Sequence, residues 1–136
     1  MKVWRILIVS LLAVALTPVA ATAAPAPKTL VQLREQGGFA GLDNRVIVYK
    51  NGCVRLSRRT GPTIDKCLTR GEWKTLRHRL KALKLGRSEQ PPQGADFIKY
   101  TLTYKGHRVS RYTLTKTWQP VVAHLQKVLV KYWAPD

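Results

Sequence analysis

The pair Asn51-Gly52, set between two runs of β-forming residues, constrains the fold more than any other stretch of the chain. Asn-Gly favours a tight two-residue hairpin turn, because both central positions of a type I′ turn need positive φ. The sequence therefore predicts antiparallel strands over 45–50 and 53–58. With this turn one face of the hairpin is apolar, and it consists of Ile47 opposite Leu56 and Tyr49 opposite Val54.

The two cysteines fit a third strand, over 63–68, that pairs with the second strand of the hairpin. If Cys53 lies opposite Cys67, then Arg55 lies opposite Asp65, so one register gives both a disulfide and a charge pair. We therefore expect a Cys53–Cys67 disulfide. Chain entropy predicts a stabilisation of about 3 kcal/mol for a closed loop of this length, about 15 residues. No Cys-x-x-Cys is present and no histidine lies near either cysteine, which disfavours a metal site.

Residues 1–23 have the pattern of a secretory signal peptide, with a basic start, an apolar run and small residues before the cleavage point. The apolar run, 6–16, is shorter than the ~20 residues that a membrane span needs. We therefore expect cleavage after Ala23, secretion to the extracellular space and no stable membrane insertion afterwards. Residues 24–28 are expected to form a flexible N-terminal arm, and 29–136 a single, monomeric domain.

Two helices are expected. Thr69 and Glu72 match a capping box at the start of a helix over 70–83, with Gly86 suited to end it. A second helix is expected over 118–133, with Thr117 as its cap. Apolar residues at helical spacing give each helix one buried stripe, formed by Trp73, Leu76, Leu80 and Leu83 in the first and by Val121, Leu125, Val128, Leu129 and Tyr132 in the second.

A strand over 29–35 and a second hairpin, 97–104 with 108–114, complete the expected elements. The register of this hairpin has two solutions. A two-residue loop places Val109 on the apolar face, whereas a three-residue loop places Tyr112 and Leu114 there. We prefer the second because it buries more apolar surface. The order predicts an α+β fold with an antiparallel sheet of about five to six strands and two helices packed on one face.

The composition is strongly basic, with 24 Lys and Arg against 7 Asp and Glu and a net charge of +17. Such a field attracts polyanions, for which cell-envelope polymers or nucleic acid are candidates. A secreted module that binds polyanions without catalysis is therefore one hypothesis. Its candidate binding residues are the clustered cations Arg58, Arg59, Arg77, Arg79 and Lys81.

The sequence offers little for catalysis. It contains no His-Glu-x-x-His and no Gly-x-Ser-x-Gly motif. Glu35, Asp43 and Asp96 remain as acid/base candidates, but nothing in the sequence brings two of them together. His78 and His124 are expected on helix surfaces. We therefore expect no enzymatic activity, no cofactor and no catalytic metal.

The stretch 36–42 places three glycines around Phe39. Glycine permits backbone angles closed to other residues, so the chain is expected to break here into a shaped loop that reaches to about Asn44. Either this loop is a bulged corner whose Phe39 folds back onto the core, or it presents Phe39 or Leu42 to a partner. The polar loop over 87–96 competes with it for a binding role.

The residues Gly37-Gly38-Phe39-Ala40-Gly41, after the strand that contains 30–34, resemble the start of the emfourin family. These are small proteinaceous inhibitors of thermolysin-like zinc metalloproteases, first associated with protealysin. The later layout is also similar, with a hairpin, a helix, Ala95-Asp96, a tyrosine-containing strand pair and a leucine-rich helix. The likeness spans about 30–132, and the signal peptide, the cysteine pair and the positive charge depart from the family pattern.

The resemblance implies an exported inhibitor that inserts a rigid loop into the cleft of an extracellular metalloprotease, with a side chain in the apolar pocket beside the zinc. Phe39 and Leu42 would be the anchors, and Asp43 would lie near the zinc. Arg34, Asn44 and Arg45 would be polar neighbours. The candidate protease-contacting residues are Gly37, Gly38, Phe39, Ala40, Gly41, Leu42 and Asp43.

Overall fold

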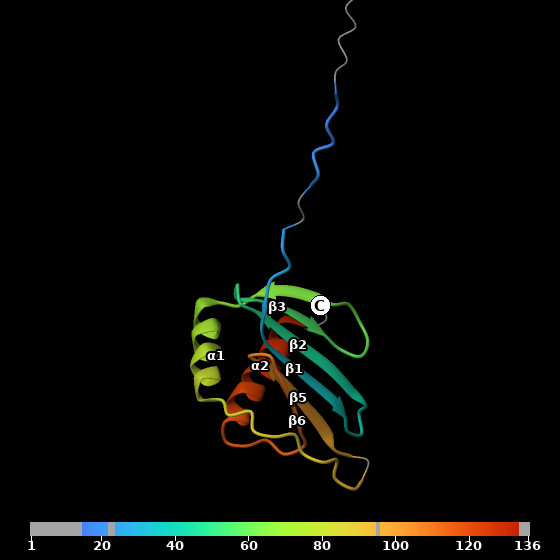
Figure 1. Ribbon diagram of the computed structural model, residues 1–136. Helices are drawn as coiled ribbons and strands as arrows, with labels where there is room; N and C mark the ends of the chain where they lie inside the picture. Colours follow the sequence, from blue (N-terminus) through green and yellow to red (C-terminus); the bar gives the residue numbers. More distant parts are fainter. Residues whose placement is uncertain (1–14, 22–23, 95, 134–136) are drawn as a thin grey trace, which may run out of the picture.

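Figure 1 shows the computed structural model, which describes residues 15–21, 24–94 and 96–133. Most of the expected signal peptide, residues 1–14 and 22–23, lies outside the described residues, as does Ala95. Residues 24–28 have no regular secondary structure, but the Lys28 carbonyl accepts a hydrogen bond of 2.8 Å from the Lys50 N–H. The last residue of the expected arm is thus joined to the sheet. No helix in the described part of the chain is long and apolar enough to cross a membrane.

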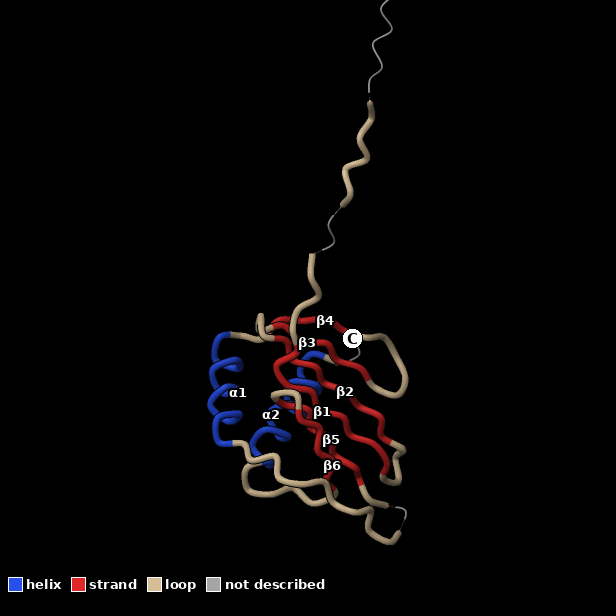
Figure 2. Tube along the Cα trace, viewed as in Figure 1, coloured by secondary structure: helices blue, strands red, loops and turns tan. Residues whose placement is uncertain are grey.

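Six antiparallel strands form one sheet, and two helices complete the fold (Figure 2), which confirms the α+β prediction. The strand order across the sheet is β4-β3-β2-β1-β5-β6, so the first strand of the chain lies at its centre. The strands are β1 (Thr29–Gly37), β2 (Leu42–Tyr49), β3 (Cys53–Ser57), β4 (Ile64–Cys67), β5 (Ile98–Tyr104) and β6 (His107–Arg111). The helices are α1 (Arg70–Ala82) and α2 (Trp118–Tyr132).

A single hydrophobic core lies between one face of the sheet and the two helices. Alternate residues of each central strand point into it, as the period of two in a strand requires. The buried apolar residues are Val31, Leu33, Val46, Val48, Val54, Leu56, Leu76, Leu80, Leu102, Val109, Trp118, Val121, Val122, Leu125, Val128 and Leu129. The opposite face carries no helix and is formed by polar and half-buried side chains such as Arg34, Arg45 and Tyr49.

The register of β3 with β4 is the predicted one. Cys53 lies opposite Cys67 and forms the disulfide with it, and Arg55 lies opposite Asp65. The Arg55 guanidinium binds the Asp65 carboxylate, with 2.9 Å between Nε and Oδ1. Both the disulfide and this ion pair lie on the face away from the helices.

The predicted register of β2 with β3 is wrong by one residue. Val46 lies opposite Leu56 and Val48 opposite Val54, so Val46 and Val48 face the core while Ile47 and Tyr49 face the open side. The loop has one more residue than expected, because Lys50 joins Asn51-Gly52 in it. Gly52, at a φ of +86°, donates its N–H to the Tyr49 carbonyl. A turn completed by one left-handed glycine is a common three-residue hairpin loop, and a shift of one residue turns every side chain to the other face.

The three-residue loop preferred for the second hairpin is also wrong. Tyr104 lies opposite His107, which leaves Lys105 and Gly106 as a two-residue turn with φ values of +50° and +77°. Val109 lies opposite Leu102 and is buried. Strand β6 ends at Arg111, because the Tyr112 and Thr113 N–H groups donate to the Glu89 carboxylate instead of to a strand. Tyr112 and Leu114 therefore lie beyond the sheet.

Helix α1 begins with the predicted capping box, in which the Thr69 hydroxyl accepts from the Glu72 N–H and the Glu72 carboxylate accepts from the Thr69 N–H. The helix ends at Ala82 rather than at Gly86, since Leu83 is already extended. Gly86, at a φ of +67°, lies in the coil that follows.

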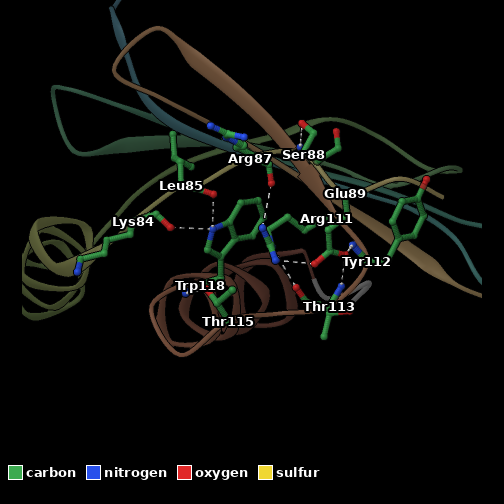
Figure 3. A network of polar contacts seen from close by, with 11 residues as sticks. Lys84, Leu85, Arg87, Ser88, Glu89, Arg111, Tyr112, Thr113, Thr115 and Trp118 are labelled. Carbon is green, nitrogen blue, oxygen red and sulfur yellow. Dashed lines mark hydrogen bonds and ion pairs between the residues drawn. The ribbon is translucent and has the colours of Figure 1, made fainter. Parts of the chain in front are cut away.

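Thr117 occupies the predicted N-terminal cap position of α2, but not through a side-chain bond to the helix. The Thr117 side chain makes no capping bond, and it exchanges hydrogen bonds with the backbone of Lys84 instead. The carbonyl of Thr115 accepts the first free N–H groups of the helix. Figure 3 shows the surrounding network, in which Trp118 Nε1 donates to the carbonyls of Lys84 and Leu85. This network fastens the segment after α1 to the start of α2.

Candidate functional site

Several loops gather at one end of the sheet (Figure 1) because neighbouring antiparallel strands begin and end there in turn. The turn 38–41 joins β1 to β2, and the loop 58–63 joins β3 to β4. Residues 96–97 lead into β5 at the same end, since Gly37 lies opposite Ile98. This end of the sheet therefore contains the glycine-rich stretch singled out in the sequence.

The glycine-rich stretch is shorter and tighter than the sequence predicts. Strand β1 continues to Gly37 and β2 starts at Leu42, so β1 and β2 form a hairpin and the break extends only over 38–41 rather than to Asn44. The Gly41 N–H donates to the Gly38 carbonyl at 3.1 Å. Gly37, Gly38 and Gly41 have φ values of +97°, +73° and +58°. Residues other than glycine rarely adopt such positive φ values. The glycines thus permit a narrow turn.

Phe39 sits at the tip of this turn and is 92% exposed. The alternative of a corner whose Phe39 folds onto the core is therefore wrong. Phe97, on the adjacent segment, is 46% exposed, and its carbonyl accepts the Gly38 N–H at 3.2 Å. Leu42, the second expected anchor, is half-buried at the start of β2. Of the two expected anchors, Phe39 is the fully exposed one.

An ion pair between Arg34 and Asp43 joins the two strands next to the turn, on the sheet face that carries no helix. Arg34 Nε lies 3.1 Å from Asp43 Oδ1, and Arg34 Nη2 lies 3.3 Å from Oδ2. The hydrogen bond from Arg34 lowers the pKa of Asp43 below its ordinary value, although desolvation opposes it. Asp43 is therefore an ionised partner of Arg34. Arg45 lies opposite Arg34 in the register and adds a second cation beside this pair.

The three carboxylates named as acid/base candidates lie in different parts of the fold. Glu35 is buried on the helix side of the sheet, where Asn44 and Gln126 donate to its two oxygens. Asp43 points to the opposite face, and Asp96 is exposed in the segment before β5. Glu35 and Asp43 are thus not brought together. Asn44, expected as a polar neighbour of the site, instead donates a hydrogen bond to Glu35 on the helix side of the sheet.

A pocket of about 500 Å³ adjoins the turn. The Arg58 guanidinium lies over the Trp133 ring, 4.9 Å from its centroid, and Arg59 Nη1 lies 3.5 Å from the Gly41 carbonyl oxygen. Trp133 is fixed by donating its Nε1–H to the Pro62 carbonyl at 2.8 Å. The pocket is lined by Ala40, Gly41, Leu42, Asp43, Asn44, Arg58, Arg59, Thr60 and Trp133. Sequence reasoning missed Trp133, because nothing in the pattern shows that the end of α2 reaches the turn.

The predicted polyanion-binding residues do not form one patch. Arg58 and Arg59 lie beside the turn, whereas Arg77, Arg79 and Lys81 lie on α1, a separate part of the molecule (Figure 1). Arg77 lies over the Trp73 ring at 5.6 Å, and Arg79 Nη1 donates to the Pro120 carbonyl at 2.9 Å. The candidate cations therefore form two separate groups, one beside the turn and one on α1.

Within the described residues, no group of three or more His, Cys, Asp or Glu side chains is placed to hold a metal ion. Comparison of the chain with models of protein families found no match, and comparison with curated proteins found none either. The emfourin resemblance therefore stays a prediction that rests on the glycine-rich stretch and on the order of the elements.

Proposed function

We propose that this protein is an exported inhibitor of thermolysin-like zinc metalloproteases that blocks the active-site cleft with the turn 38–41. The observation that carries the proposal is the 92% exposure of Phe39 at the tip of a narrow hairpin. A large aromatic side chain gains most of its binding free energy when a partner's pocket buries it. The apolar pocket beside the zinc of such a protease suits a phenylalanine.

The contacts of the turn support this role because they limit its motion before binding. The Gly41 N–H to Gly38 carbonyl bond closes the turn, and the Gly38 N–H to Phe97 carbonyl bond ties it to the next segment. The Arg34–Asp43 ion pair joins the two strands just below it. A loop that is ordered in the free protein loses less conformational entropy on binding.

The shape of the turn favours blockage over cleavage. Phe39 and Ala40 occupy the centre of a turn closed by the hydrogen bond between Gly38 and Gly41. A peptide bound along a protease cleft lies extended, as a peptide added to a sheet edge does. The turn therefore fits the cleft as a plug. The excess of Lys and Arg over Asp and Glu, which persists without residues 1–23, would steer the protein toward an acidic protease.

The test measures inhibition of a thermolysin-like protease by the chain from residue 24, which contains every strand and helix of the described fold. We expect inhibition by the unaltered protein and a loss of potency of roughly 30-fold or more for Phe39→Ala, as for a central interface anchor. Val130→Ala is the matched control, since Val130 is also an exposed apolar side chain, at 64%, but lies on α2. Its potency should be unchanged.

Two results would count against the proposal. A lack of inhibition at micromolar excess over the protease would reject that protease as a target. Equal potency of Phe39→Ala and the unaltered protein would remove Phe39 from the interface even where inhibition occurs.

Polyanion binding remains the second candidate function, and the excess of cations favours it. It predicts retention on heparin that falls steeply with salt and does not respond to Phe39→Ala. Retention should instead fall when Arg58 and Arg59, or Arg77, Arg79 and Lys81, are replaced by glutamine. The two sets of variants thus separate the two functions.

A further inference from the structure

A groove of about 670 Å³ runs between α1 and α2, apart from the turn 38–41. Its walls come from residues at helical spacing on each helix, and small residues on both sides leave room between them. The lining residues are Gly71, Glu72, Thr75 and Arg79 from α1 and Ala123, His124, Lys127, Val128 and Lys131 from α2. None of them belongs to the proposed inhibitory site.

Cations outnumber carboxylates in this groove. Arg79, Lys127 and Lys131 line it, against Glu72 alone. Lys131 is paired with Glu72, at 2.6 Å between Nζ and Oε1. Lys127 has no ion-pair partner within the described part of the chain, and it lies one helical turn before Lys131, where like charges repel. The groove therefore keeps an uncompensated positive charge.

His124 supplies the second observation. It is only 8% exposed and lines the groove, and its Nε2 has no hydrogen-bond partner among the described residues. A buried polar atom without a partner is costly. The sequence placed His124 on a helix surface, which is wrong. Desolvation, followed by the nearby charge of Arg79, lowers the pKa of His124, although Glu72 opposes this, so the ring is neutral at neutral pH.

The charged side chains of the groove are mostly hydrogen-bond donors. Arginine and lysine side chains are donors only. Glu72 is the one carboxylate in the lining, and both its oxygens already accept, Oε1 from Lys131 and Oε2 from Tyr132 and the Thr69 N–H. The Arg79 guanidinium makes one hydrogen bond, from Nη1 to the Pro120 carbonyl, which holds it at the groove. Cationic donors thus outnumber carboxylate acceptors in the groove.

We propose that the groove between α1 and α2 binds an oxyanion of the phosphate or sulfate type, held by Arg79 and Lys127 beside the buried ring of His124. The planar guanidinium matches the oxygens of such an anion, and charge-assisted bonds of this kind are the stronger ones in proteins. Lys131 adds charge at longer range while it stays paired with Glu72.

Sulfate is the probe, because it remains a dianion throughout the titration of histidine. NMR resolves the three histidines, His78, His107 and His124, and each is titrated in sodium sulfate and in sodium chloride at equal ionic strength. We expect sulfate to raise the titration midpoint of His124 relative to chloride, because the bound anion stabilises the imidazolium. His78 and His107 are exposed and lie outside the groove, so their signals serve as internal references.

The shift in the His124 titration midpoint is expected to saturate as the sulfate concentration rises. This saturation curve measures the sulfate affinity of each variant. Lys127→Gln should weaken binding about tenfold, the loss expected for one charge-assisted contact. Lys74→Gln is the matched control, because it removes the same charge from an exposed position on α1 outside the groove. Identical His124 midpoints in both salts, or equal losses in the two variants, would overturn the proposal.

A second arm identifies the source of the anion by using inorganic polyphosphate. Binding of polyphosphate that weakens in Lys127→Gln but not in Lys74→Gln would place a phosphate group of a polymer in the groove. Polyphosphate binding that is indifferent to Lys127, together with the sulfate effect on His124, would restrict the groove to free anions.

Discussion

Gly37 ends β1 in a conformation that few other residues adopt, at a φ of +97°. A Cβ at this position would lie 2.8 Å from the Phe97 carbonyl oxygen, closer than real contacts allow. This is the carbonyl that accepts the Gly38 N–H, so the strain would act on the bond that ties the turn to the next segment. The space at Gly37 is therefore part of what positions Phe39.

We predict that Gly37→Ala lowers the free energy of unfolding by about 2 kcal/mol or more, from backbone strain and from the clash. Gly106→Ala is the control, because Gly106 has a similar φ of +77° but open space around its missing Cβ. Gly106→Ala should lower the free energy of unfolding only by the backbone strain, about 1 kcal/mol. Urea unfolding of both variants measures the difference, and equal losses would show that the Phe97 carbonyl exerts no constraint.

Some residue properties were predictable from the sequence and others were not. The pairing of Cys53 with Cys67 and that of Arg55 with Asp65 were predictable, because a single register of the two strands satisfies both. The exposure of Phe39 was not, since a glycine-rich stretch permits either a folded-back or a projecting side chain. The burial of His124 was missed because a single histidine next to an apolar stripe can be either buried with the stripe or exposed on the helix surface.

At the scale of elements, Glu72 does more than cap α1. It also binds Lys131 and Tyr132 near the end of α2, so it joins the two helices. Desolvation, the largest effect, raises the pKa of Glu72, but hydrogen bonds from Lys131, the Thr69 N–H and Tyr132 outweigh it and lower the pKa from 4.5 to about 2. The folded protein therefore prefers the ionised carboxylate.

A depressed pKa stabilises the fold above the unfolded pKa, and this contribution is lost as the pH falls from 4.5 to about 2. We predict that Glu72→Gln, which keeps a capping side chain, lowers the free energy of unfolding at pH 7 by up to about 3 kcal/mol. The difference from the unaltered protein should shrink across that interval. Urea unfolding at several pH values tests this.

Asp65→Asn is the control for the acid interval. It removes one carboxylate from the ion pair with Arg55, in which both side chains are more than half exposed, at 62% and 52%. Exposed pairs contribute little to stability. A pH dependence of Glu72→Gln no larger than that of Asp65→Asn would contradict the role given to Glu72.

The hairpins show how far sequence patterns reach at this scale. The sequence predicted the positions of the strands, because β-forming runs bounded by glycine mark them. The registers failed because loops of two and three residues compete for similar sequences. In the first hairpin Lys50 joins Asn51-Gly52 in the loop, and in the second Lys105 accepts a positive φ so that a shorter loop forms. Each loop differs by one residue from the prediction, which is enough to exchange the faces of a strand.

At the scale of the whole molecule, the disulfide fastens an edge of the sheet. Cys67 ends β4, a short edge strand with a partner on one side only, and joins it to β3. We predict that replacing Cys53 and Cys67 by serine lowers the free energy of unfolding by about 3 kcal/mol, the entropy of closing a loop of this length. Urea unfolding measures the change. The unaltered protein in reductant should match the variant, and a mismatch would assign part of the effect to the serines.

The assembly of the site at the end of the sheet was beyond sequence reasoning. The strand order was not specified in advance, and it is this order that brings the turn 38–41, the loop 58–63 and Trp133 together. Likewise, the groove between the helices needs the packing of α1 against α2, which the spacing of apolar residues predicts only as a buried stripe on each helix. Long-range placement is where a single sequence carries least information.

The central position of β1 has a practical meaning for attachment. Thr29 enters the sheet at the end opposite Phe39, and the segment before it leads away from the molecule (Figure 1). Trp133, in contrast, lies in the pocket beside the turn. A linker, label or solid support joined ahead of β1 would therefore leave Phe39 pointing outward, whereas one joined after Trp133 would crowd it. The fold thus places a point of attachment at one end of the sheet and the exposed Phe39 at the other.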